Sequence, residues 1–158
     1  MSQDTIEFRK MTQEEFARFH EDNLEGYAQD IARAFKRPIE GERVRAKEQV
    51  TGLLPKGVDT EGHYLFNAID TKSGNKVGNV WINIDEAKSR AFLYDIVVDE
   101  PFRGKGYGRK IMNLMEKMLK EMKISSVELH VFAYNTVAIN LYKTQGYNTA
   151  SFNMQKSI

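Results

Sequence analysis

Cysteine is absent from this chain of 158 residues, and only three prolines occur in it. The lack of cysteine excludes disulfide bonds, cysteine-ligated zinc and a thiolate nucleophile. The sequence also lacks any apolar stretch of membrane-spanning length and any secretory run near its start, MSQDTIEFRK. It contains no spacing typical of metal ligands. These absences predict a cytoplasmic protein with no membrane partner and no metal.

Net charge is nearly absent as well, because 23 basic and 22 acidic side chains leave only +1 at pH 7. A chain so balanced has no overall attraction for nucleic acid, which is therefore not predicted as a partner. Hydrophobic residues make up 41% of the chain, as in ordinary globular proteins. This length is typical of one domain, so we expect a single domain over residues 1–158.

The most informative stretch is a predicted strand, glycine loop and helix between residues 91 and 122. Residues 91–98 are rich in β-branched and aromatic side chains, and three glycines follow within residues 101–108. Free N–H groups at the start of a helix bind a phosphate when glycines let it come close. The helix is predicted from apolar residues that recur with a 3.6-residue period: Ile111, Leu114, Met115, Met118, Leu119 and Met122.

Two familiar phosphate-binding motifs do not fit this loop. In the nucleotide P-loop a serine or threonine follows the lysine, but here Lys110 is followed by Ile111. The dinucleotide fingerprint requires a third glycine where Arg109 or Ile111 stands. Both readings are therefore excluded.

The pattern R-x-x-G-x-G does fit, as Arg103, Gly106 and Gly108. It resembles the coenzyme A pyrophosphate loop of the GCN5-related N-acetyltransferases, the GNAT superfamily. Residues 127–147, VELHVFAYNTVAINLYKTQGY, resemble the C-terminal half of the same family, and residues 6–16 are similar to its first strand and helix start. Two motifs in the expected order and context are much more specific than one loop.

The resemblance implies an α/β (α+β) GNAT fold with a central, mostly antiparallel mixed sheet, one parallel splayed strand pair and flanking helices. It implies an N-acetyltransferase that moves the acetyl group of acetyl-CoA to a primary amine by direct attack in a ternary complex. The acceptor is an amine-bearing small molecule, peptide or protein. Its identity, a longer acyl group and a homodimer are left open. The alternative is a CoA-binding sensor or interaction domain that has kept the fold without acetyl transfer.

The resemblance also implies where the coenzyme binds. The unpaired edge of the central strand would bind pantetheine by β-type hydrogen bonds to the backbone of Val97 and Val98. Asn135 would donate to and accept from the pantetheine arm, cap the following helix, or do both. The pyrophosphate would be held by the loop, whose members are Arg103, Gly104, Lys105, Gly106 and Gly108, with Arg109 and Lys110 nearby for charge.

Two residues are candidates for proton transfer. In the family, a tyrosine at the place of Tyr142 protonates the departing thiolate, and the alternative is a core aromatic. Asp95 is the only charged residue in its apolar strand and is predicted either to be a general base, directly or through water, or to make a structural pair. His20 and His63 are weaker candidates, and His130 is predicted to be a packed strand residue.

Elsewhere, residues 5–10, 64–70, 76–84, 127–133 and 147–157 are predicted as strands, and the strand at 127–133 is expected to run parallel to the central one. Thr12 and Glu15 form a capping-box pattern, so a helix should begin there. Residues 14–35 favour helix, interrupted near Asn23 and Gly26. Residues 43–54 are predicted as a second helix with its apolar side chains inward, namely Val44, Val50 and Leu53.

The first of these helices is acidic along residues 21–30. Its carboxylates either attract a cationic amine or form a solvated face. The residues concerned are Glu21, Asp22, Glu25 and Asp30.

Overall fold

The computed structural model describes residues 5–158, which divide into two compact units. Unit 1 contains residues 5–18 and 54–130, and unit 2 contains residues 19–53 and 131–158; each is described by itself. Within residues 5–158 no helix is long and apolar enough to cross a membrane. The single domain over residues 1–158 stays a prediction.

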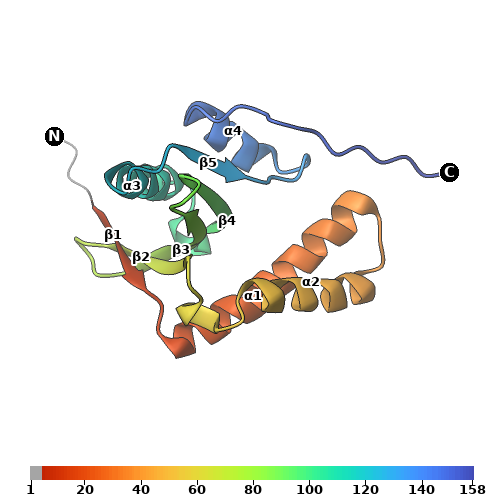
Figure 1. The fold of residues 1–158 in the computed structure, drawn as a ribbon, viewed down its shortest axis with the longest axis horizontal. Coiled ribbons are helices and arrows are strands. Elements are labelled where there is room, and N and C mark those ends of the chain that lie inside the picture. The colour runs from red at the N-terminus through yellow and green to blue at the C-terminus, as the bar shows by residue number, and fades with distance from the viewer. Residues whose placement is uncertain (1–4) are drawn as a thin grey trace. The chain divides into compact units, whose positions relative to one another are not determined.

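Unit 1 is built on a five-stranded sheet with strand order β1-β2-β3-β4-β5 (Figure 1). The first four strands are antiparallel neighbours, and β4 and β5 run parallel. This arrangement confirms the predicted mixed, mostly antiparallel sheet with one parallel pair. The strands are β1 (Ile6–Lys10), β2 (His63–Asp70), β3 (Lys76–Asp85), β4 (Arg90–Val98) and β5 (Ser126–Leu129).

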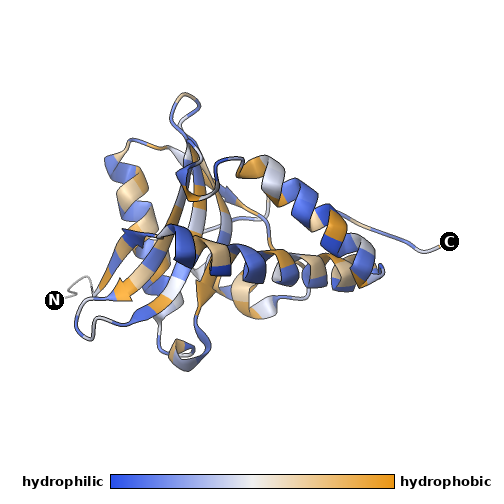
Figure 2. Cartoon of the chain, turned by 90° about the horizontal axis from the view of Figure 1, so that it is seen from below, coloured by the Kyte–Doolittle hydropathy of each residue, from blue (hydrophilic) through white to orange (hydrophobic). Residues whose placement is uncertain are grey.

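Helix α3 (Tyr107–Glu121) connects β4 to β5 and packs on one face of the sheet. Its apolar period appears as predicted, with the addition of Met112, which the predicted face left out. The sheet supplies buried β-branched and leucine side chains, and Figure 2 shows apolar residues recurring along the strands. The fully or almost fully buried helix residues are Ile111, Met112, Met115 and Leu119.

Strand β4 contains a bulge that decides which way its later residues face. Leu93 is paired with Ile82, whereas Asp95 is paired with Trp81, so Tyr94 is the extra residue. Neighbouring residues of β3 lie on opposite faces of the sheet, and therefore Leu93 and Asp95 also lie on opposite faces although they are two positions apart.

Strands β4 and β5 separate at the bulge. Their ladder ends at the pair Leu93 and Leu129, while β4 continues to Val98. The predicted splayed pair is confirmed, but the second strand ends at Leu129 instead of continuing to residue 133. Residues 130–133 form no strand because the diverging β4 no longer offers them a ladder.

Helix α1 (Gln13–Phe35) is continuous, so the predicted interruption near Asn23 and Gly26 is wrong. A single exposed glycine costs a helix only about 1 kcal/mol, which a long helix tolerates. The capping box at its start is confirmed. The backbone N–H of Thr12 donates to Glu15 at 2.9 Å, and the backbone N–H of Glu15 donates to the Thr12 hydroxyl at 3.1 Å.

In unit 2, helix α2 (Ile39–Leu53) begins four residues earlier than predicted, directly after a proline. Its predicted inward face is partly wrong. Val44 is 59% exposed, whereas Ala46 and Val50 are buried. Helix α4 (Thr136–Thr144) follows later, and the predicted strand over residues 147–157 does not form in the described chain.

Candidate functional site

The glycine loop before α3 has the form of an anion site. Gly104 and Gly106 have φ angles of 75° and 83°, and the space beside each α-carbon is open. Gly106 is the N-cap of α3, so no side chain there accepts from the first turn. Within residues 5–158, the N–H groups of residues 104–109 donate to no backbone carbonyl outside the helix. A row of such N–H groups at the positive end of a helix favours phosphate.

The basic side chains of this loop do not act alike. The Arg103 Nε donates to the Val98 carbonyl at 2.9 Å, which ties the loop to the end of β4 and leaves the other guanidinium N–H groups for a further acceptor. Lys110 lies over the Tyr107 ring, with Nζ 5.1 Å from its centroid. Lys105 and Arg109 are exposed at the predicted place.

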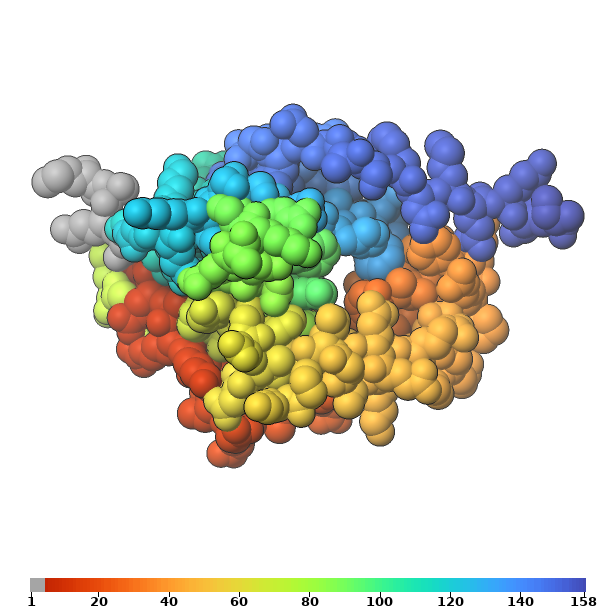
Figure 3. Space-filling view, viewed as in Figure 1, coloured from red at the N-terminus to blue at the C-terminus, as the bar shows by residue number. Residues whose placement is uncertain are grey.

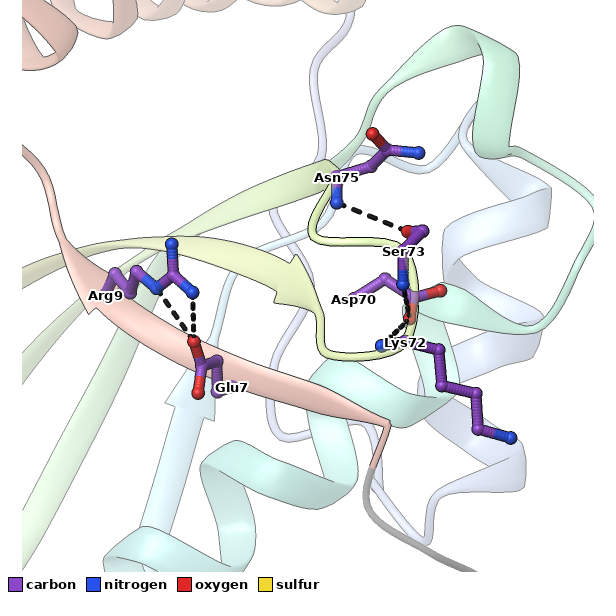
Figure 4. A network of polar contacts seen from close by, with 6 residues as sticks. All are labelled: Glu7, Arg9, Asp70, Lys72, Ser73 and Asn75. Atoms are coloured by element: carbon purple, nitrogen blue, oxygen red, sulfur yellow. Dashed lines mark hydrogen bonds and ion pairs between the residues drawn. The ribbon is translucent and has the colours of Figure 1, made fainter.

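A tyrosine at the start of α3, which sequence reasoning missed, joins the loop to the turn between β2 and β3. The Tyr107 hydroxyl donates to Asp70 Oδ2 at 2.7 Å. The other carboxylate oxygen accepts from the N–H groups of Lys72 and Ser73 (Figure 4). These hydrogen bonds, that of Tyr107 first, lower the pKa of Asp70, and the same bond to Asp70 raises the pKa of Tyr107.

Replacing Tyr107 with phenylalanine should raise the pKa of Asp70 toward its ordinary value, as a carboxyl-carbon NMR titration would measure. The lowered pKa of Asp70 stabilises the fold above its unfolded-state pKa, and this contribution is lost as pH falls through the folded-state pKa. The parent should therefore melt higher than the variant near neutral pH, and the difference should vanish in strong acid. An unchanged Asp70 pKa in the variant would contradict this link.

The outer part of β4 presents an unpaired edge toward the side from which β5 has diverged. The Val97 carbonyl lies toward β3, because a β-carbon built on Gly78 would approach it to 2.2 Å. The N–H of Asp99 also points to β3, where it donates to Val77 at 2.8 Å. Backbone groups alternate along a strand, so Ile96 and Val98 face the free edge. Among the predicted contacts the geometry favours Val98 over Val97, and it adds Ile96, which sequence reasoning missed.

Gly78 should be required for this arrangement. Replacing it with alanine places a methyl group against the Val97 carbonyl, and only movement of β3 away from β4 can relieve the contact. Overpacking of this kind typically costs about 1–3 kcal/mol, so we expect a fall of that size in the free energy of unfolding, measured with urea. Gly52→Ala is the matched control, because nothing lies within 4 Å of its added carbon. Equal stability of the two variants would contradict the prediction.

Asp95 lies next to an aromatic cluster on the face opposite α3. It is partly buried and pairs across the ladder with Trp81, whose indole stacks on Tyr94 with centroids 4.5 Å apart. The indole N–H donates to His63 Nδ1 at 3.0 Å, and burial lowers the pKa of that histidine. His63 thus serves as a neutral acceptor for Trp81. Burial also raises the pKa of Tyr94.

The other two histidines lie elsewhere. His20 is partly buried on α1. His130 is exposed and follows the end of β5, so its prediction as a packed strand residue is wrong. The reason is the early end of the β4 and β5 ladder, which leaves His130 outside the sheet.

In unit 2, Asn135 and Tyr142 belong to one helix. Asn135 is the N-cap of α4, where its side-chain oxygen accepts from the Ala138 N–H at 3.2 Å, so the capping role is confirmed. Tyr142 is partly buried and meets the ring of Tyr147 edge-on at 6.0 Å. Two helical turns separate Asn135 from Tyr142, which places them on nearly the same side of α4.

A tyrosine just before α4 attaches this segment to α1 within unit 2. The Tyr134 hydroxyl donates to Asp30, and the Arg33 guanidinium lies 3.9 Å from the ring centroid. Burial first, and then the hydrogen bond to Asp30, raise the pKa of Tyr134 to about 12. These contacts fix the chain immediately before Asn135. No sequence motif indicated them.

The acidic residues of α1 also divide by role. Arg43 donates to both carboxylate oxygens of Glu25, at 3.0 and 2.8 Å, and Gln29 donates to it as well. These hydrogen bonds, that of Arg43 first, lower the pKa of Glu25 to about 2. The carboxylates of Glu25 and Asp30 therefore accept hydrogen bonds within unit 2, while Glu21 and Asp22 are exposed. Within residues 5–158 no group of three or more His, Cys, Asp or Glu could hold a metal ion.

Comparisons with known proteins agree on one family. Residues 14–147 match the model of the acetyltransferase (GNAT) family. The chain is 31% identical over 156 residues to YycN, an uncharacterized N-acetyltransferase of Bacillus subtilis (strain 168), and the alignment covers 98% of this chain and 99% of YycN. The crystal structure of YycN superposes with a TM-score of 0.91, again over 98% of this chain and 99% of the other.

Two further proteins that resemble this chain are named for their acceptors. A [ribosomal protein bS18]-alanine N-acetyltransferase of Haemophilus ducreyi is 34% identical over 107 residues, which are 64% of this chain and 71% of that protein. The structure of spermidine N-acetyltransferase from Vibrio cholerae, in complex with CoA and spermine, has a TM-score of 0.62 at 17% identity over 91% of this chain and 81% of the other. This second likeness concerns the fold.

Proposed function

Because the chain belongs to the acetyltransferase (GNAT) family and is thereby an N-acetyltransferase, we propose that it transfers the acetyl group of acetyl-CoA to a primary amine by direct attack. The observation that carries the proposal is the loop before α3, in which the N–H groups of residues 104–109 donate to no backbone carbonyl outside the helix and Gly104 and Gly106 have positive φ. In this role the loop binds the pyrophosphate. Arg103, Lys105 and Arg109 add positive charge.

The free edge of β4 would bind the pantetheine arm. Extended amide ligands add to such an edge through backbone hydrogen bonds, and Ile96 and Val98 offer them here. The Val97 carbonyl points toward β3, so the role of Val97 is to hold this part of β4 in the sheet. Asn135 has its side-chain N–H₂ left for a ligand, because its oxygen caps α4.

Acetyl-CoA supplies an acyl group activated as a thioester. The neutral amine forms a bond to the acyl carbon, the carbon–sulfur bond breaks, and the electron pair leaves on sulfur. Tyr142 gives its proton to that sulfur, which a phenol protonated at neutral pH is able to do. Asp95 takes the proton released from the amine, directly or through water. The N–H of Val98 would polarise the thioester carbonyl.

The test is release of thiol from acetyl-CoA in the presence of a panel of amines. The panel contains a polyamine, an alanyl peptide and ornithine, chosen because relatives are named for such acceptors. We expect at least one amine to raise thiol release about tenfold or more above the rate without amine. Binding of acetyl-CoA without amine-dependent release from a broadened panel would favour the CoA-binding sensor instead. A cytoplasmic location stays a prediction.

A further inference from the structure

The chain makes a tight turn immediately before α4. The N–H of Asn135 donates to the Phe132 carbonyl at 2.9 Å, which closes a turn over residues 132–135. Residues 131–135 belong to no strand, and Ala133 and Asn135 are exposed, so no ladder of the sheet holds this segment. Asn135 ends the turn and is also the N-cap of α4. The direction of its side chain therefore depends on what holds the turn in place.

The Tyr134 side chain anchors this turn to α1 within unit 2. Its hydroxyl donates to Asp30, and the Arg33 guanidinium lies 3.9 Å from the ring centroid. Asp30 and Arg33 are three positions apart, which places them on one face of α1. The Phe132 ring stacks on the Tyr134 ring with centroids 6.0 Å apart. In Figure 3 the blue atoms of the segment before α4 lie against the orange atoms of α1.

This anchor is strong, because its hydrogen bond ends on a carboxylate. The cation beside the ring adds a further attraction. Burial first, and then the hydrogen bond to Asp30, raise the pKa of Tyr134 to about 12, so the phenol keeps its proton near neutral pH and remains a donor. The hydroxyl takes no part in the cap of α4, so its effect on Asn135 passes through the backbone of the turn.

We propose that Tyr134 is a positioning residue for the coenzyme: it holds the turn on α1 and thereby aims the side-chain amide of Asn135 at the pantetheine arm. The inference rests on the proposed function, which takes this amide as a coenzyme contact. The Asn135 oxygen accepts from the Ala138 N–H at 3.2 Å, so the cap fixes the amide and leaves its N–H₂ for a ligand. Without the anchor the turn is free to rotate, and the amide loses its fixed direction.

A double-mutant cycle on coenzyme binding tests this role. Tyr134→Phe keeps the ring and removes the hydrogen bond to Asp30, and we expect it to raise the dissociation constant for acetyl-CoA about fivefold to tenfold, as isothermal titration measures. Asn135→Ala should raise it by at least as much. In the Asn135→Ala background the change of Tyr134 should have no further effect, because the phenol acts through Asn135. Two effects that multiply would overturn the proposal.

Arg43→Gln is the matched control, because it breaks another side-chain contact of α1 in the same unit, the pair of hydrogen bonds to Glu25. It should leave the dissociation constant for acetyl-CoA within about twofold of the parent. Equal weakening by Arg43→Gln and Tyr134→Phe would indicate a general loosening of α1 and refute the positioning role. Asp30→Asn keeps an oxygen that accepts from the phenol, so it should bind acetyl-CoA more tightly than Asp30→Ala.

Amide hydrogen exchange supplies a readout without coenzyme. The Ala138 N–H is protected by the cap, and Tyr134→Phe should speed its exchange at least about tenfold, whereas Arg43→Gln should not. Unchanged exchange in Tyr134→Phe would show that the phenol does not hold the cap, and the proposal would be wrong. A parent that binds no acetyl-CoA would contradict the proposed function itself. Equally tight binding by the parent and Tyr134→Phe would overturn this inference alone.

Discussion

Tyr142→Phe should lower the rate of acetyl transfer by ~10²–10⁴-fold, the usual contribution of general acid catalysis. The substitution removes only a hydroxyl group, so the ring keeps its edge-on contact with Tyr147 and α4 keeps its packing. The dissociation constant for acetyl-CoA should therefore change little. The rate falls because the transition state is less stabilised: without the phenol proton, sulfur leaves as a thiolate.

Single-turnover rates across a range of pH are the appropriate measurement, because another step can limit kcat. Tyr147→Phe is the matched control, since it makes the same change in the neighbouring ring of the same segment and should leave turnover near that of the parent. If Tyr142→Phe reacts within about threefold of the parent where chemistry limits the rate, the hydroxyl is not the acid. Tyr142 would then be a packing residue, and solvent would protonate the thiolate.

Gly106→Val should raise the dissociation constant for acetyl-CoA at least tenfold, equivalent to about 1.4 kcal/mol. Gly106 has a φ of 83°, which a β-branched residue adopts only with strain, and its open side is where the proposal places the pyrophosphate. The valine side chain would keep phosphate oxygens away from the first N–H groups of α3. Isothermal titration with acetyl-CoA measures the change.

Strain alone must be separated from the loss of the anion site. Gly74→Val provides that control, because Gly74 also has a positive φ, of 76°, and open space beside it, but lies in the turn between β2 and β3. The two variants should lose similar stability, and only Gly106→Val should lose coenzyme affinity. Unchanged affinity in a folded Gly106→Val protein would remove the loop from the proposed coenzyme site.

The sequence was sufficient for features that depend on local pattern. The period of α3, the capping box of Thr12 and Glu15, and the antiparallel strands were predicted from residues close together in the chain. Gly26 was given too much weight, because a breaker signal is weak inside a helix of 23 residues. The end of β5 was missed because it depends on the divergence of another strand.

Features that depend on distant partners could not be predicted. Tyr107 meets Asp70 across 37 positions, and Tyr134 meets Asp30 across 104. Nothing in the local sequence of either tyrosine distinguishes a tethered hydroxyl from an exposed one. The choice between Val97 and Val98 at the free edge was hidden for a different reason, since it follows from the bulge at Tyr94.

The position of that bulge shows that the face and edge presented by each later residue of β4 depend on the number of residues before it and not on their type. With Tyr94 deleted, Leu93 and Asp95 would become neighbours in a regular ladder and would keep their opposite faces, whereas deletion of Ile96 would exchange the amide directions of Val97 and Val98. Point substitutions along β4 preserve these directions, whereas a one-residue deletion or insertion between Asp95 and Val98 reverses them for the residues that follow. Engineered chimaeras of this protein should therefore exchange residues 93–98 as one block of fixed length.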